Sequence, residues 1–370
     1  MVKNSSRTKH FRILVMIAAA VLFFGFETCD SGNDGDKLGT SANPCLISTE
    51  NDLAALAFRV NSGTEPSGMH YKLADDIDLS AYSAGSGWTP IGNNSNPFKG
   101  NFDGNGKAVS NLYIDDDGLD FAGLFGSLSG GTVNNIVVEN AIIAGSNHVG
   151  GVAGVVKNGG SISNCYVTGE ISGNQGVGGV AGTVEKNGSS ISNCSVTGNV
   201  SGYYFAGGVA GLIDDDGSVN NCYTTGNVSG YNGMGGIAGL LDGKGSVSNC
   251  YAAGEVSGNL NVGGIAGYVG DGFITDCAAL NDHSGGSETT FGRVTDDFYG
   301  SMICNNVVLM TTTTASPFDD PNDIHGDGYN KATVTDQDIY DTSPLTWNFG
   351  GNDANPWKWV GGSYPLPLLY

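Results

Sequence analysis

Between residues 149 and 277, small apolar and polar residues follow the same pattern five times. From Val149 the chain reads VGGVAGVVKNGGSISNCYVTGEISG, and close copies begin at Val177, Ala206, Met234 and Val262. Apolar positions such as Ile162, Cys165 and Val167 are separated by polar residues, and the glycine-rich repeats show no helical i, i+3, i+4 pattern of apolar residues. A repeat of roughly 20 to 50 residues is typical of a solenoid, whose units bury their apolar faces only by stacking.

The length of one repeat indicates which solenoid to expect. About 28 residues bounded by Gly and Asn turns can hold three short strands, each pairing with its copies about 4.8 Å away. We therefore predict an all-β chain in which each repeat is one coil of a parallel β-helix. Crossovers between parallel strands are almost always right-handed, so we expect a right-handed coil. One further copy carries Ile136 in place of cysteine, so the predicted regular β-helix covers residues 121–281.

Two columns of identical residues should run along this stack. The first is a cysteine ladder of Cys165, Cys194, Cys222, Cys250 and Cys277. In-register cysteines about 4.8 Å apart are too far apart to bond, so we expect buried free thiols. The second column precedes the first, at Asn164, Asn193, Asn221 and Asn249. Stacked Asn side chains can bond along the column and tolerate a left-handed backbone at a bend, so we assign both columns a structural role.

The segments on either side of the regular repeats should cap the stack. Thr49 to Asp52 begins a capping box followed by LAALAFRV, which predicts one short helix. We assign residues 41–120 to an N-terminal cap and irregular first coils, because a bare first coil would expose strand edges. Residues 282–370 should form a C-terminal cap, with aromatic residues concentrated in the last 25 positions.

These motifs resemble a known family. GGVAG, NCYVTG, NCSVTG, NCYTTG, GGIAG and NCYAAG are similar to the GLUG repeat of bacterial surface proteins, which also lies beside the catalytic part of the M26 immunoglobulin A peptidases. Upstream WTPIG and FKGNFDGNGKAVSNLYI, and downstream RVTDDFYGSMICNN, resemble the segments that flank these repeats. The resemblance covers roughly residues 40 to 370 and implies a scaffold, without naming a reaction.

The N-terminus has the features of an export signal. Four basic residues precede an apolar run at 13–26, which is short for a membrane span, so we predict a signal peptide over residues 1–28. Cys29 follows at once and resembles a bacterial lipoprotein site, with residues 29–40 as a flexible tether. Ordinary secretion with cleavage nearby is the alternative.

Charge narrows the classes of partner. Removal of residues 1–28 leaves 11 basic and 36 acidic residues, a net charge of −25. Such a chain should repel nucleic acid and anionic membranes, so we expect membrane association only through a lipid anchor. Acidic clusters at residues 115–117 and 214–216 precede glycine and fit turns. Calcium binding there is the alternative, although neither cluster has the spacing of a calcium loop.

Catalytic motifs are missing from the sequence. Residues 60–292 contain no arginine, the five histidines are isolated, and neither HExxH, GxSxG nor a phosphate loop occurs. The zinc site of the M26 peptidases therefore has no counterpart. We predict a protein that is not an enzyme and uses no cofactor or metal.

Two groups of aromatic residues are candidates for binding. Tyr166, Tyr223 and Tyr251 follow the cysteine ladder and should point outward, either to bind a ligand or to stack on one another and stabilise the coil. The loops before the GG pairs carry Tyr203, Tyr204, Phe205 and Tyr231, which should form one contiguous aromatic patch on adjacent coils.

The sequence favours a non-catalytic, adhesin-like scaffold. We expect export to the cell envelope or outer surface and binding of a host surface protein or a glycan through the repeat edges. A purely structural envelope spacer without a ligand is the first alternative, and a glycan-cleaving β-helix enzyme is the second.

Overall fold

The structure is a computed structural model that describes residues 38–281 without a gap. Beyond them it describes 283–285, 291–292, 294–298, 302–304, 306–309, 328–331, 357–360 and 366–369. The predicted signal peptide, Cys29 and the predicted tether up to residue 37 lie outside these residues, as does most of the predicted C-terminal cap.

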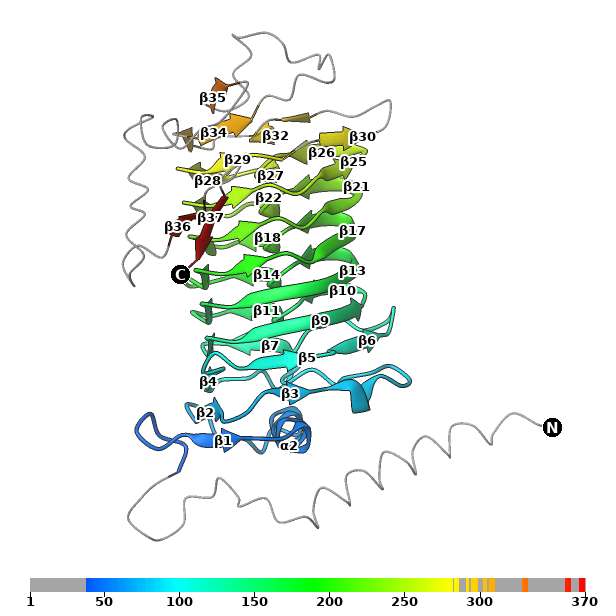
Figure 1. The fold of residues 1–370 in the computed structure, drawn as a ribbon, viewed down its shortest axis with the longest axis vertical. Coiled ribbons are helices and arrows are strands. Elements are labelled where there is room, and N and C mark those ends of the chain that lie inside the picture. Colours follow the sequence, from blue (N-terminus) through cyan, green and yellow to red (C-terminus); the bar gives the residue numbers. More distant parts are fainter. Residues whose placement is uncertain are drawn as a thin grey trace, which may run out of the picture.

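Short parallel strands are stacked in a column, and each regular coil adds strands to three sheets (Figure 1). The first sheet contains β1 (Cys45–Ile47), β2 (His70–Leu73), β4 (Asn101–Asp103), β8 (Thr132–Asn134), β12 (Ser161–Ser163), β15 (Ser190–Ser192), β19 (Ser218–Asn220), β23 (Gly245–Ser248), β28 (Gly272–Thr275) and β33 (Met302–Cys304). The second contains β7 (Phe125–Ser129), β11 (Ala153–Lys157), β14 (Ala181–Glu185), β18 (Ala210–Asp214), β22 (Ala238–Leu241), β27 (Ala266–Val269) and β32 (Thr295–Phe298).

The third sheet is split into more and shorter strands. It contains β3 (Ile77–Asp78), β5 (Ala108–Ser110), β6 (Tyr113–Asp115), β9 (Val137–Ala144), β10 (Asn147–Gly150), β13 (Tyr166–Gly178), β16 (Ser195–Val196), β17 (Asn199–Gly207), β20 (Tyr223–Thr224), β21 (Val228–Gly235), β24 (Tyr251–Ala252), β25 (Val256–Gly258), β26 (Leu260–Gly263), β29 (Ala278–Ala279), β30 (His283–Gly285), β31 (Phe291–Gly292), β34 (Asn306–Leu309) and β35 (Gly328–Lys331). The predicted parallel β-helix with coils of about 28 residues is confirmed.

Strand register places equivalent residues directly above one another. Ile162 pairs with Ile191 and Ile191 with Val219, so one apolar column follows the first sheet. These side chains are fully buried, and the ladder cysteines are at most 2% exposed. Each coil thus covers the apolar interior of the next, which is why a single repeat could not fold alone.

Glycine is required where adjacent coils approach most closely. A Cβ atom on Gly211, the last residue of GGVAG, would lie 2.3 Å from the backbone carbonyl carbon of Gly176 in the coil below. Gly182 and Gly239 meet the preceding coil in the same way, at 2.4 Å. Real Cβ atoms do not tolerate such distances, so this motif glycine sets how tightly the coils stack.

One helix covers the N-terminal end of the stack (Figure 1). Helix α2 (Glu50–Asn61) is capped by Thr49, whose side chain accepts a hydrogen bond from the backbone N–H of Asp52. In return, the Asp52 carboxylate accepts a hydrogen bond from the backbone N–H of Thr49. The predicted capping box and helical cap are therefore confirmed. The buried face of α2 includes Leu53 and Leu56, and a 3-10 turn (Ser80–Tyr82) follows later in the cap.

At the C-terminal end the stack continues past the predicted boundary at residue 281. Strands β30 to β34 each pair in parallel with the strand one coil below, which makes one more coil. Parallel pairing needs backbone alignment and not the Gly and Cys pattern, so the stack can continue after the regular repeats end. Further on, β36 (Trp357–Val360) pairs antiparallel with β37 (Leu366–Leu369). The aromatic cap stays a prediction.

Candidate functional site

The five ladder cysteines are buried and free. Each thiol donates to the carbonyl oxygen two residues earlier, as Cys194 does to Ser192 at 3.2 Å. The same sulfur accepts the backbone N–H of the cysteine below, with Cys165 N 3.4 Å from Cys194 Sγ. Burial raises the pKa of each thiol from Cys165 to Cys250, which favours the uncharged form. Cys45, outside the ladder, is disulfide-bonded.

The asparagine column shapes the bend before each cysteine. Asn164, Asn193, Asn221 and Asn249 all have φ between 51° and 54°. The expected left-handed backbone is thus present at every position. Side-chain bonding along the column is partial: Asn164 Nδ2 donates to Asn135 Oδ1 at 3.2 Å, whereas Asn193 Oδ1 is buried without a hydrogen-bond partner among the described residues.

A second column of left-handed residues lies before the GG pairs. Its members are Phe121, His148, Gly176, Phe205, Gly233 and Asn261, with φ values from 51° to 77°. Phe121 and Phe205 are its two bulky members, and a bulky residue at positive φ costs on the order of 1 to 3 kcal/mol. Phe205 lies next to the loop tyrosines. Its ring lies against the backbone of Gly233 in the next coil. Sequence reasoning did not predict this strain, although the glycines at equivalent positions were a signal for it.

The loop aromatics form one cluster on the surface. We call Tyr203, Tyr204, Phe205 and Tyr231 the aromatic cluster. Tyr203 is 50% exposed, and Tyr204 and Tyr231 are each 36% exposed. Tyr203 stacks on Tyr231 with ring centroids 5.0 Å apart and planes 7° from parallel, while Tyr204 stands perpendicular to Tyr203 at 4.6 Å. The predicted contiguous patch on adjacent coils is confirmed as a geometry; its role in binding stays a prediction.

The other tyrosine column does not have the predicted exposure. Tyr166 is half-buried, and its hydroxyl lies 3.0 Å from Thr197 Oγ1. Tyr223 and Tyr251 are buried, at 6% and 0% exposure, so neither ring is accessible to a ligand as the sequence suggested. Both share the register column of Tyr166, and neither belongs to the apolar core between the sheets, whereas Ala252 after Tyr251 does. The rings of Tyr223 and Tyr251 stack with their centroids 4.9 Å apart and their planes 2° from parallel, which supports the alternative that they stabilise the coil.

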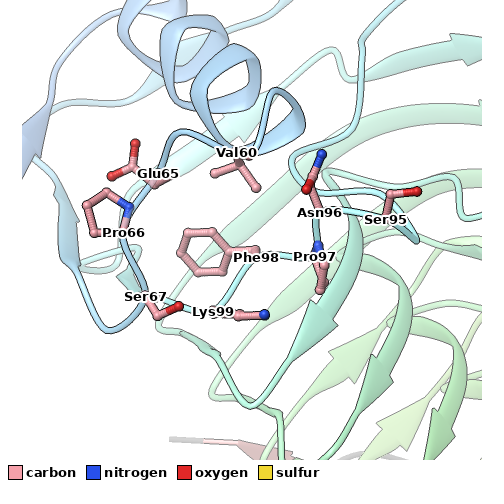
Figure 2. Close-up of a pocket in the computed structure, with 11 residues that line it drawn as sticks. Val60, Glu65, Pro66, Ser67, Ser95, Asn96, Pro97, Phe98 and Lys99 are labelled. Atoms are coloured by element: carbon pink, nitrogen blue, oxygen red, sulfur yellow. The ribbon is translucent and has the colours of Figure 1, made fainter.

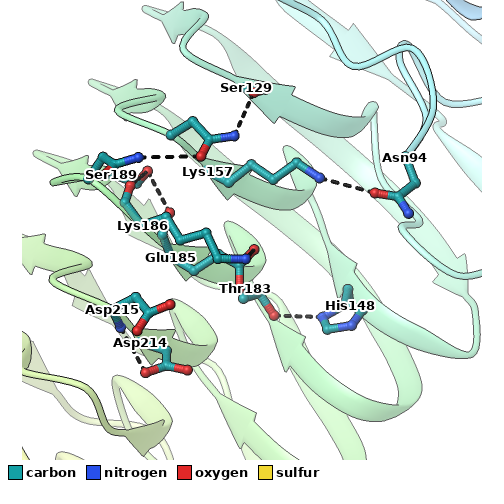
Figure 3. A network of polar contacts seen from close by, with 12 residues as sticks. Asn94, Ser129, His148, Lys157, Thr183, Glu185, Lys186, Ser189, Asp214 and Asp215 are labelled. Atoms are coloured by element: carbon teal, nitrogen blue, oxygen red, sulfur yellow. Dashed lines mark hydrogen bonds and ion pairs between the residues drawn. The ribbon is translucent and has the colours of Figure 1, made fainter.

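Charged residues collect on another edge of the stack. Lys157, Glu185 and Asp214 occupy equivalent positions at the ends of three adjacent strands (Figure 3). Partial burial and the nearby acidic groups Asp215 and Asp242 raise the pKa of Asp214. In the same region His148 Nδ1 lies 2.7 Å from Thr183 Oγ1, and burial lowers the pKa of this histidine.

A cavity of about 230 Å³ lies where the end of α2 meets the first coils (Figure 2). Val60, Phe98 and Lys99 line it, together with Glu65. The Glu65 carboxylate accepts hydrogen bonds from Arg59 Nε at 2.6 Å and from the Tyr71 hydroxyl. Because this buried charge is engaged within the cap, we assign the cavity to cap packing.

The described residues offer neither a metal-binding group nor a membrane-spanning helix. No group of three or more His, Cys, Asp or Glu side chains within them is arranged to hold a metal ion. Over the same part of the chain, no helix is long and apolar enough to span a membrane.

Comparison with known proteins identifies the repeats. The chain carries GLUG-motif repeats: the family model described as the GLUG motif matches residues 145–172, 173–201 and 230–257. The chain is 39% identical over 134 residues to "Halomucin" of Haloquadratum walsbyi, and this match covers 33% of the chain. It is 32% identical over 127 residues, 34% of the chain, to a "Putative Gly-rich membrane protein" of Evansella cellulosilytica. The chain spans only 1% and 14% of the lengths of these relatives.

A solved structure has a similar fold. The crystal structure of a "putative immunoglobulin A1 protease" from Bacteroides ovatus matches with a TM-score of 0.57 and 24% sequence identity. The match covers 89% of this chain and 93% of that chain. At this identity, the likeness concerns the fold alone.

Proposed function

We propose that the protein is a non-catalytic scaffold, displayed at the cell envelope, that binds a ligand through the aromatic cluster. The observation that carries the proposal is three exposed tyrosine rings held by mutual stacking on a rigid stack of coils. Rings already ordered before binding lose little entropy on contact, and aromatic side chains contribute large contact areas.

Display at the envelope rests on the N-terminal sequence and on the relatives. The basic and apolar segments before Cys29 support export, and attachment of lipid to Cys29 would hold the chain at the membrane. The relative from Evansella cellulosilytica is named as a membrane protein, which agrees with this location. A clickable fatty acid should label the parent chain and not Cys29→Ala, and a Cys29→Ala chain that still takes up label would rule the site out.

The test of binding uses substitutions that the repeats themselves supply. Asn174 and Asn259 occupy the tyrosine column in the adjacent coils, and Gln175 pairs with Tyr204. A Tyr203→Asn, Tyr204→Gln, Tyr231→Asn chain should therefore fold normally and lose binding on an array of glycans and extracellular-matrix proteins. Tyr166→Ser, which copies the paired residue Ser195, is the matched control.

The structural alternative predicts a different outcome. If the aromatic cluster only protects the coil, the triple variant should melt at a lower temperature and bind as the parent does. That result would favour an envelope spacer over a binding protein.

A further inference from the structure

Strand register places amide side chains on both sides of the stacked tyrosines. Gly173 pairs with Gly202 and Gly202 with Gly230, so the next residues share one column in the order Asn174, Tyr203, Tyr231, Asn259. The adjacent column reads Gln175, Tyr204, Asn232, Leu260. Asn174, Gln175 and Asn259 are exposed. Tyrosine is longer than asparagine, so the two rings extend beyond the amides on either side.

The ring geometry leaves aromatic surface free for stacking. Tyr203 and Tyr231 cover only the faces that they turn toward each other. Tyr204 lies 4.6 Å from Tyr203 and 6.4 Å from Tyr231, with Tyr203 and Tyr231 5.0 Å apart. These distances make a nearly right-angled triangle, so Tyr204 stands beside the stack and not on its end. The outer face of Tyr203 is thus turned toward Asn174, and that of Tyr231 toward Asn259.

Four adjacent coils carry no formal charge along this edge of the protein. Residues 171–184, 200–213, 228–241 and 256–269, which are equivalent segments of four adjacent coils, contain no Asp, Glu, Lys or Arg. The chain as a whole is strongly acidic, with a net charge of −22. An anionic ligand would find no Lys or Arg in these segments and would be repelled at long range. A cationic ligand would find no carboxylate in them.

We propose that the aromatic cluster binds an uncharged glycan. This inference rests on the proposed binding function and names its ligand class. A neutral sugar ring has an apolar face of C–H groups, which can lie on the free face of Tyr203 or Tyr231. Its rim of hydroxyl groups both donates and accepts hydrogen bonds. Amides do the same, and Asn174, Gln175 and Asn259 would meet that rim.

Affinity electrophoresis tests this proposal with defined probes. Gels would contain dextran, mannan, galactomannan or xyloglucan as neutral probes, and heparin or polygalacturonate as anionic probes. At least one neutral polysaccharide should retard the parent chain, equally at 50 mM and 500 mM NaCl, because no ion pair contributes. Tyr203→Asn with Tyr231→Asn should weaken this binding at least tenfold, and Asn174→Ala with Gln175→Ala about fivefold. Tyr166→Ser should not change it.

Two outcomes would overturn the proposal in distinguishable ways. Binding of the parent chain to anionic probes alone, or to immobilised fibronectin or collagen alone, with loss in the tyrosine variant, would refute the glycan and preserve the proposed binding function. If the folded parent chain binds no polysaccharide and no matrix protein, both the glycan proposal and the proposed binding function are refuted.

Discussion

Substitution of Gly211 by alanine should disrupt the stack more than its single added methyl group suggests. The new Cβ would lie 2.3 Å from both the Gly176 carbonyl carbon and the Val177 nitrogen, and ordinary contact begins near 3.4 Å. The coils would have to separate locally by about 1 Å. Both contacting atoms belong to backbone held in the parallel ladder, so no side chain can move aside.

The expected loss combines two contributions. Overpacking of this kind costs about 1 to 3 kcal/mol, and each weakened ladder hydrogen bond about 0.5 to 1.5 kcal/mol. With one or two bonds affected, we expect about 3 kcal/mol, which should lower the melting temperature by roughly 6 to 12 °C. Gly118→Ala is the control, because Gly118 is exposed and its Cβ would meet only Asp116 Oδ1 at 3.4 Å. Equal melting temperatures for the two variants, measured by circular dichroism, would refute the close approach of the coils.

Three further predictions concern other parts of the molecule. The five ladder thiols should not react with Ellman's reagent in the folded chain and should react in guanidinium, because burial excludes the reagent and raises the pKa of the four thiols from Cys165 to Cys250; rapid reaction of the native chain would contradict their burial. Burial lowers the pKa of His148, so the unfolded chain binds the extra proton first and stability should fall as pH drops below the ordinary histidine pKa of about 6.5. His148→Asn, the residue found at Asn261, should reduce this loss in melting curves taken between pH 7.5 and 5. Thr49→Ala should destabilise the helical cap by about 1 kcal/mol and Thr49→Ser much less, as hydrogen exchange of α2 would show; equal exchange in both would exclude the capping box.

The repeat period was sufficient to predict the stack. Spacing of the GG pairs fixed the length of a coil, and the cysteine and asparagine columns fixed its register, because in-register pairing is the only way to bury every apolar face at once. The helical cap was also predictable, since Thr49 and Asp52 form a local motif that depends on no distant contact.

The burial of individual side chains was less predictable. The register places Tyr223 and Tyr251 in one column with Tyr166, but it does not specify that their rings are buried while that of Tyr166 is half-buried. Loop aromatics were predicted correctly as a group because Tyr203 and Tyr231 share a register position. Their ring orientations depend on contacts between coils, which the sequence does not specify.

The claim that the aromatic cluster is a binding site is tested most directly by one comparison of dissociation constants. The parent chain and the Tyr203→Asn, Tyr204→Gln, Tyr231→Asn chain would be titrated by calorimetry with the strongest ligand from the array, and melting temperatures would be measured on the same samples. We predict a dissociation constant at least tenfold weaker for the variant, with melting temperatures within about 2 °C. Equal dissociation constants would contradict the claim, whatever the melting temperatures.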